Sequence, residues 1–151
     1  MNIRDATAND QPEIKALIFS VLREYGLKPD PATTDMDLDD IEAHYTRRGG
    51  YFGVVTEEGA VVATLAIFRV DDDNCELRKM YSVPAFRGRG KGRQLLTYSL
   101  NKAREMGFKR ITLETASPLV EAIGLYQQFG FTEFQPEHKA TRCDKAFELM
   151  L

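Results

Sequence analysis

Seven consecutive residues, Arg87 to Arg93, alternate basic side chains with glycines in the order R-G-R-G-K-G-R. Glycine tolerates positive φ and lets the backbone approach a ligand closely. The segment follows an expected strand that ends near Ser82 and leads directly into an expected helix. Backbone N–H groups at the start of a helix bind anions, and the helix dipole reinforces them. We therefore predict a phosphate-binding loop, and pyrophosphate is the ligand that such a loop suits best.

Other interpretations of this loop remain open on the residues alone. One is a tight strand–helix turn whose basic residues only interact with solvent. A second is a basic patch for nucleic acid, but a net charge of −3 and a pI near 5.5 argue against the broad basic surface that this requires. Mononucleotide- and dinucleotide-binding loops are disfavoured, because neither the G-K-[ST] nor the G-x-G-x-x-G spacing is present.

The composition is typical of one soluble domain. Of the 151 residues, 43% are hydrophobic and 28% are charged, so we expect a single domain over residues 1–151. No apolar run approaches the ~20 residues of a membrane helix, and no secretory signal is visible. We therefore expect a cytoplasmic protein without a membrane partner. The two cysteines cannot make a disulfide framework, and with only two histidines no metal-ligand spacing is present, so we expect no metal.

The hydrophobic pattern predicts a mixed α/β (α+β) sheet that is covered by helices. Antiparallel hairpins come first in the chain, and a strand–helix–strand unit follows. Helices are expected over residues 11–25, 37–45, 93–106 and 118–129, and Ser117 is expected to cap the last of these, with Pro118 at its first position. Strands are expected over residues 2–7, 51–56, 61–70, 75–83, 110–115, 131–134 and 145–151.

Two segments together resemble the GNAT superfamily of acyl-coenzyme A N-acyltransferases. Arg87-x-x-Gly90-x-Gly92 matches the family signature [Q/R]-x-x-G-x-[G/A], and it lies between a strand and a helix as in that family. Later in the chain, residues 122–131 (AIGLYQQFGF) resemble the family element A-x-x-L-Y-x-x-x-G-F. The resemblance is strong over residues 76–134 and weak before residue 50.

The resemblance implies a GNAT-like fold and an acetyl-transfer activity. The implied fold is a mostly antiparallel sheet of six to seven strands, flanked by four helices, with splayed central parallel strands. The implied reaction is the transfer of an acetyl group from acetyl-coenzyme A to a primary amine, by direct attack in a ternary complex. No metal is implied.

The coenzyme site of the family maps onto two stretches of this sequence. Loop amides would hold the pyrophosphate, and the backbone of the splayed strand would pair with the pantetheine arm. An amide at Ser82 or its neighbour would donate to the thioester oxygen; serine stands here where the family usually has valine. The expected coenzyme-binding residues are Met80, Tyr81, Ser82, Arg87, Gly88, Arg89, Gly90, Lys91, Gly92 and Arg93.

Tyr126 stands where family members often carry the acid that protonates the departing thiolate. A phenol with a pKa of about 10 suits a thiol with a pKa of about 8.5. The alternative is that Tyr126 belongs only to the apolar face of its helix. The two interpretations are compatible, because a tyrosine can bury its ring and expose its hydroxyl.

Glu76 and Glu114 match positions that carry the general base in different family members. On a regular strand Glu76, Arg78, Met80 and Ser82 share one face, which would direct Glu76 toward the reaction. The alternative for Glu76 is an ion pair with Arg78. Glu114 alternates with apolar residues on its own strand and is expected to face away from them.

The acceptor site of this fold is usually built from the first two helices and their connecting loop. Residues 1–75 carry 15 acidic and 7 basic side chains, whereas residues 76–151 carry 8 and 13. We therefore expect an acidic lid that attracts a small cationic amine, with Tyr25, Tyr45 and Phe52 as apolar walls. The acids of this expected lid are Asp30, Asp35, Asp37, Asp39, Asp40, Glu42 and Asp71 to Asp73. A protein N-terminus or lysine as acceptor, and a non-catalytic acyl-coenzyme A-binding regulatory module, remain as alternatives.

Three further expectations concern the C-terminal part of the chain. Leu119 stands where relatives often carry an asparagine that binds the coenzyme, and Ser117 replaces it only in part. Residues 146–151 form a strand that either completes the sheet or pairs across a homodimer. Cys143 follows Arg142, which would lower the pKa of its thiol, but we assign it no role.

Overall fold

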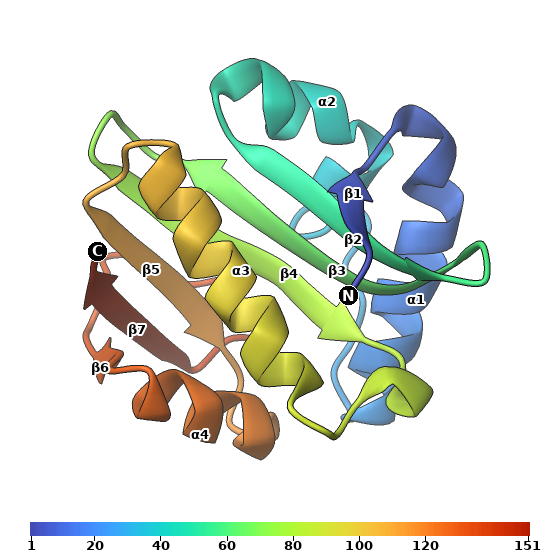
Figure 1. Ribbon diagram of the computed structural model, residues 1–151. Helices are drawn as coiled ribbons and strands as arrows, with labels where there is room; N and C mark the ends of the chain where they lie inside the picture. Colours follow the sequence, from blue (N-terminus) through green and yellow to red (C-terminus); the bar gives the residue numbers. More distant parts are fainter.

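Seven strands form one sheet in the order β1-β2-β3-β4-β5-β7-β6, as seen in a computed structural model that describes residues 1–151 (Figure 1). All neighbouring strands are antiparallel except β4 and β5, which are parallel. The expected mixed, mostly antiparallel sheet is thereby confirmed. The strands are β1 (Ile3–Asp5), β2 (Tyr51–Glu57), β3 (Ala60–Arg69), β4 (Asn74–Ser82), β5 (Arg110–Thr115), β6 (Thr132–Glu133) and β7 (Lys145–Met150).

Four α-helices cover the two faces of the sheet (Figure 1). On one face lie α3 (Lys91–Glu105) and α4 (Val120–Gln128), and on the other lie α1 (Gln11–Glu24) and α2 (Ile41–His44). Short 3-10 turns span Ala8–Asp10, Met36–Asp39, Thr46–Arg48 and Pro84–Phe86. No helix combines the length and the apolar character needed to cross a bilayer.

Each face of the sheet has its own hydrophobic core, because strand side chains alternate between the faces. Leu96 and Leu100 of α3 pack with Leu65 of β3 on one face. Ile18 and Leu22 of α1 belong to the core on the other face. The apolar residues of α1 recur at helical spacing, which is why the sequence predicts this helix well.

A β-bulge interrupts the middle of β4. Arg78 lies opposite Ala66 and Tyr81 lies opposite Thr64, so β4 has one more residue than β3 between these pairs. The irregular residue is Lys79, whose φ of 53° lies in the left-handed region that non-glycine residues rarely adopt. The Thr64 hydroxyl donates to the Lys79 carbonyl at 2.6 Å and ties the bulge to β3.

The bulge reverses the alternation of side chains along β4. Arg78 and Tyr81 lie on the face covered by α1, whereas Met80 packs with the core beneath α3. Ser82 lies opposite Ala63, which belongs to the same core beneath α3. The expectation that Glu76, Arg78, Met80 and Ser82 share one face is therefore wrong, because Lys79 inserts an extra residue between the first two and the last two.

The parallel strands β4 and β5 separate beyond the bulge. They pair only over residues 74–77 and 110–113, and from there to Ser82 one edge of β4 has no neighbouring strand. The Val83 N–H donates to the Val62 carbonyl of β3 at 3.0 Å. Because the polar groups of a strand alternate in direction, the N–H and C=O of Ser82 point to the open edge. The expected splayed parallel pair is confirmed.

Three predicted helices differ from the observed ones at their starts, and α3 begins at Lys91, two residues before its expected start. The helix expected over residues 37–45 is divided into a 3-10 turn and α2, because Asp40 has non-helical backbone angles and caps α2 by accepting from the Ala43 N–H at 3.1 Å. In α4 the N-cap is Leu119, not Ser117. The Ser117 hydroxyl and N–H instead donate to the carboxylate of Asp144.

The C-terminal strand β7 completes the sheet of its own chain. It lies between β5 and β6 and pairs with both. Of the two expected alternatives, the structure therefore contains the first, a strand within the sheet of its own chain.

Candidate functional site

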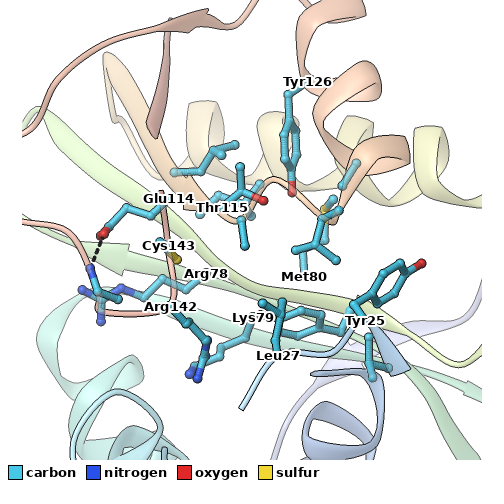
Figure 2. Close-up of a pocket in the computed structure, with 18 of the residues that line it drawn as sticks. Tyr25, Leu27, Arg78, Lys79, Met80, Glu114, Thr115, Tyr126, Arg142 and Cys143 are labelled. Carbon is cyan, nitrogen blue, oxygen red and sulfur yellow. Dashed lines mark hydrogen bonds between the residues drawn. The ribbon is translucent and has the colours of Figure 1, made fainter. Parts of the chain in front are cut away.

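A cavity of about 770 Å³ opens where β4 and β5 separate (Figure 2). Its walls come from α1 and the loop after it, from β4 and β5, from α4, and from residues 138–143. Segments from both ends of the chain therefore meet at one site. The expected site residues that line it are Glu76, Met80, Tyr81, Ser82, Arg87, Gly88, Gly92, Glu114 and Tyr126.

The loop before α3 presents unpaired backbone N–H groups. Gly88, Arg89 and Gly90 have φ values of 89°, 51° and 75°, so three successive residues adopt the left-handed conformation. The N–H groups of these three residues, and those of Gly92 and Arg93, donate to no acceptor in the protein. Five N–H donors at a helix start suit a bound pyrophosphate.

The glycines of the loop also leave space beside its backbone. A Cβ added at Gly88 or Gly90 would meet nothing within 4 Å, and one at Gly92 would meet only the Leu125 side chain at 3.5 Å. Gly88 and Gly90 are therefore favoured by their positive φ values. At position 92 neither a positive φ nor close packing requires a glycine. An open approach to the Gly92 N–H fits a loop that contacts a ligand.

The Arg87 guanidinium joins the loop to two neighbouring elements. It donates to the Ser82 carbonyl from Nε at 3.1 Å and from Nη2 at 2.7 Å, and it forms an ion pair with Glu24 of α1. The bond to Arg87 lowers the pKa of the Glu24 carboxyl. Arg87 thus holds the open end of β4 in place, and its charge is already paired.

The other basic side chains of the loop lie outside the cavity. Arg93 Nη2 donates to the side-chain Oε1 of Gln128 at 2.5 Å, and its guanidinium stacks on Phe129, which ties α3 to α4. Arg89 and Lys91 line a separate depression of about 250 Å³. At the cavity the loop offers backbone N–H groups, and its basic side chains supply a positive surrounding.

Tyr126 combines a buried ring with an available hydroxyl. The residue is 6% exposed, and its ring packs against Phe131 and Phe147 at centroid distances of 5.7 and 6.4 Å. Its hydroxyl points into the cavity and has no hydrogen-bond partner in the protein (Figure 2). Burial, and then the nearby Tyr81, raise the pKa of Tyr126 well above its ordinary value, so the phenol stays protonated at neutral pH.

Glu114 lies on the opposite side of the cavity and is half-buried (Figure 2). Its Oε1 accepts a hydrogen bond from the Ala140 N–H at 2.7 Å. Burial raises the pKa of Glu114, the bond from Ala140 lowers it, and the neighbouring Glu76 raises it further, so that the net shift is upward. As expected, Glu114 faces away from its apolar neighbours on β5, which belong to the core. A carboxylate with a raised pKa is suited to accept a proton.

Glu76 lines the same cavity but is ion-paired. Its Oε1 accepts from Arg78 Nε at 2.5 Å, and the Arg78 guanidinium stacks on Phe68 at 3.8 Å from the ring centroid. The alternative expectation, an ion pair between Glu76 and Arg78, is therefore what the structure contains. Of the two glutamates, only Glu76 forms an ion pair, so the Glu114 carboxylate is the one more available to accept a proton.

The expected acidic lid does not face the cavity. Asp35 is buried against Lys79 and Arg142, Asp30 accepts bonds from its own loop, and Asp39 pairs with Lys15. None of the aspartates of the chain lines the cavity. The expectation of an acidic lid was wrong, because a count of charges does not reveal which carboxylates the fold uses internally.

The expected apolar walls are confirmed only in part. Tyr25 lines the cavity, whereas Tyr45 and Phe52 are buried in the core on the α1 face. Leu119 also lines the cavity. Burial raises the pKa of the Cys143 thiol to about 11, opposite to the lowering expected from Arg142.

The segment over residues 138–143 forms one wall of the cavity and contains none of the predicted site residues. Ala140, Arg142 and Cys143 come from a stretch with neither helix nor strand, so no periodic pattern marks them. In the structure, two features mark this segment as part of the site: the hydrogen bond from the Ala140 N–H to Glu114 and the burial of the Arg142 side chain. No three His, Cys, Asp or Glu side chains gather as a metal site anywhere in the chain.

Comparisons with known proteins agree with this geometry. The sequence model of the acetyltransferase (GNAT) family matches residues 16–131. An uncharacterized N-acetyltransferase of Escherichia coli K12, YjgM, is 42% identical over 134 residues, which are 85% of this chain and 80% of YjgM. A crystal structure of an acetyltransferase from Streptococcus agalactiae has a TM-score of 0.90 at 25% identity, covering 99% of this chain and 98% of its own. The yncA protein from Salmonella typhimurium, solved with its cofactor acetyl-CoA, has a TM-score of 0.74 at 24% identity, covering 99% and 93%.

Proposed function

The chain belongs to the acetyltransferase (GNAT) family and is an N-acetyltransferase of that type, and from this premise we propose that its acceptor is the primary amine of a small molecule. One observation carries the proposal: a single cavity joins unpaired loop N–H groups, the open edge of β4, and the side chains of Tyr126 and Glu114. Coenzyme and acceptor would meet inside this cavity, between β4 and β5.

The chain's own residues fit acetyl-coenzyme A, which supplies the acetyl thioester. The N–H groups of Gly88, Arg89, Gly90, Gly92 and Arg93 would bind the pyrophosphate. Along the open edge of β4, the Ser82 N–H would donate to the thioester oxygen as negative charge develops there. Loss of one such donor typically lowers kcat by about 10²–10³-fold.

Two side chains would move the protons of the reaction. Glu114 would accept the proton of the attacking ammonium, directly or through one water, because its raised pKa makes it a stronger base than an exposed carboxylate. The amine nitrogen would then bond to the acetyl carbon, the carbon–sulfur bond would break, and the nitrogen would lose its second proton as the amide forms. Tyr126 would donate its proton to the departing thiolate, because its hydroxyl points into the cavity without a partner in the protein, and the second proton from the nitrogen would return to Tyr126 through water.

The acceptor would be held at the Glu114 end of the cavity. Glu76 and Glu114 both line that end, and a primary amine is an ammonium at neutral pH, so it would pair with them. A small molecule is favoured over a protein, because the loop after α1 and the 138–143 segment add walls around this end of the cavity.

The test is acetyl-coenzyme A-dependent release of free thiol, measured with a panel of small amines and a lysine-containing peptide. We expect at least one small amine to be acetylated and Glu114→Gln to lower kcat/KM with that amine. Acetylation of the peptide alone would overturn the acceptor class. Thiol release that is equally fast with Glu114→Gln would overturn the assignment of the base.

A further inference from the structure

A buried cluster of charged side chains lies beside the acceptor end of the cavity. The Asp35 side chain has no exposed surface, and its two oxygens accept from Arg142 Nη1 and Nη2 at 2.7 Å each. Lys79 Nζ donates to the same carboxylate, as does the Asp30 N–H at 2.8 Å. Burial alone would raise the pKa of Asp35, but the bonds to Arg142 and Lys79 lower it to about 2, so the group is a carboxylate.

This cluster joins three segments that are distant in the sequence. Asp35 belongs to the loop after α1, Lys79 is the bulge of β4, and Arg142 lies in the segment before β7. Bidentate Arg–carboxylate pairs hold their partners in a defined geometry. Figure 2 shows Arg142 and Lys79 extending to the same wall of the cavity. The cluster therefore clamps the 138–143 segment against the loop after α1.

The clamped segment also carries a hydrogen bond to the proposed base. Ala140, two residues before Arg142, donates its N–H to Glu114 Oε1 at 2.7 Å. Asp144, which follows the segment, donates its N–H to the carbonyl of Thr115, the residue after Glu114, at 3.1 Å and accepts from the Ser117 N–H at 2.8 Å. Arg142 is the only side chain of residues 135–144 that hydrogen-bonds to the loop after α1.

We propose that Arg142 is a positioning residue, which through its buried pair with Asp35 holds the Ala140 N–H on the Glu114 carboxylate and keeps the acceptor wall in place. The inference rests on the proposed function, in which Glu114 is the base. Arg142 acts through the backbone of its segment and is assigned no contact with the reacting atoms.

The expected effect on the reaction follows from the groups that face Glu114. Glu76 and Arg78 face it from β4, whereas Lys139, the Ala140 N–H and Cys143 face it from the 138–143 segment. The Ala140 N–H stabilises the charged carboxylate, so its loss raises the pKa of Glu114. A base with a higher pKa is protonated over a wider range, and the acid limb of kcat/KM then moves to higher pH.

The experiment compares Arg142→Met, Arg142→Lys and the matched control Arg4→Met. Arg4 also forms a bidentate pair, with Asp10 at 2.8 Å for both bonds, but it does not line the cavity. We expect Arg142→Met to move the acid limb of kcat/KM for the amine upward by about one pH unit. Arg142→Lys should shift it less, Arg4→Met should not shift it, and the Kd of acetyl-coenzyme A should stay within about twofold, since no pyrophosphate donor is touched.

An unshifted acid limb in a folded Arg142→Met variant would overturn the inference. Ala140→Pro provides a second test if Arg142→Met does not fold, because proline removes the N–H itself; it should move the limb in the same direction, and an unmoved limb would again overturn the inference. Failure of the proposed function gives a different result, in which Glu114→Gln retains full activity.

Discussion

The two ends of the cavity are built in different ways. At the coenzyme end, five N–H groups come from one contiguous loop, residues 88–93, and the glycines in it set the backbone. At the acceptor end, the walls come from the loop after α1, from β4 and from the 138–143 segment, and buried charges between distant residues hold them together. The first end depends on local backbone geometry, and the second depends on long-range side-chain pairing.

This difference predicts distinct consequences of mutation. Changes at the coenzyme end should alter coenzyme binding and leave the fold intact, whereas changes at the acceptor end should alter stability and the proton transfers. The variants below separate the two ends, in order of decreasing expected effect.

Tyr126→Phe removes the hydroxyl and leaves the buried ring in place. We expect kcat to fall by about 10²–10⁴-fold, because the departing thiolate loses its proton donor. The Kd of acetyl-coenzyme A should change little, since the hydroxyl is assigned to the departing thiolate and not to the pyrophosphate. A kcat within threefold of wild type would show that Tyr126 serves only to pack against Phe131 and Phe147.

Asp35→Asn leaves Arg142 without its carboxylate partner and leaves Lys79 with only the more distant Asp37 Oδ1, at 3.4 Å. Breaking a buried ion pair by removing one partner costs about 3–5 kcal/mol, and we expect a loss of unfolding free energy in that range at neutral pH. Chemical denaturation monitored by circular dichroism measures it. A loss below 1 kcal/mol would show that this cluster contributes little to the acceptor end.

The same carboxylate predicts a pH dependence of wild-type stability. Because the folded-state pKa of Asp35 is lowered to about 2, its contribution is complete above the unfolded value of 3.8 and is lost as pH falls toward 2. The difference corresponds to about 2 kcal/mol. Asp35→Asn should flatten the stability curve between pH 4 and pH 2, and an unchanged curve would contradict this assignment.

Gly92→Asp places a carboxylate where the loop N–H groups are unpaired. Its Cβ would meet only the Leu125 side chain at an ordinary distance, so the fold should tolerate the change. We expect the Kd of acetyl-coenzyme A to rise at least tenfold, by repulsion of the pyrophosphate, and the melting temperature to move little. Unchanged coenzyme affinity would move the phosphate site away from this loop.

Arg89→Ala tests whether the loop binds through its backbone or through its side chains. Arg89 lines the separate depression and not the main cavity, so we expect the Kd of acetyl-coenzyme A to change by about twofold at most. Calorimetric titration at low and high salt measures this. A tenfold loss that high salt abolishes would assign the phosphate contacts to the basic side chains.

The same contrast explains what could be predicted from the sequence. The glycine loop was recognised because φ requirements and alternating charge leave a local pattern, and the helical spacing of apolar residues located α1. The left-handed conformation of Lys79 could not be predicted from a local pattern, because the residue is not glycine. Its carbonyl accepts from the Thr64 hydroxyl and its ammonium donates to Asp35, and both partners are distant in the sequence.

Long-range pairing accounts for the errors at the acceptor end. Asp35 and Arg142 are 107 residues apart, so their pairing is invisible to spacing rules. The charge count predicts an acidic lid, but carboxylates such as Asp35 and Asp39 already form ion pairs within the protein. Ser117 was assigned to a helix cap for the same reason, since its partner Asp144 lies 27 residues away.

Titration calorimetry of the purified protein with acetyl-coenzyme A, and separately with ATP and NAD, tests the central claim most directly. The account predicts micromolar binding of acetyl-coenzyme A and no comparable binding of the two nucleotides. The loop would bind the phosphates of acetyl-coenzyme A, and the open edge of β4 would bind its pantetheine arm, which ATP and NAD lack. Equal affinity for all three ligands, or no binding of acetyl-coenzyme A, would contradict it.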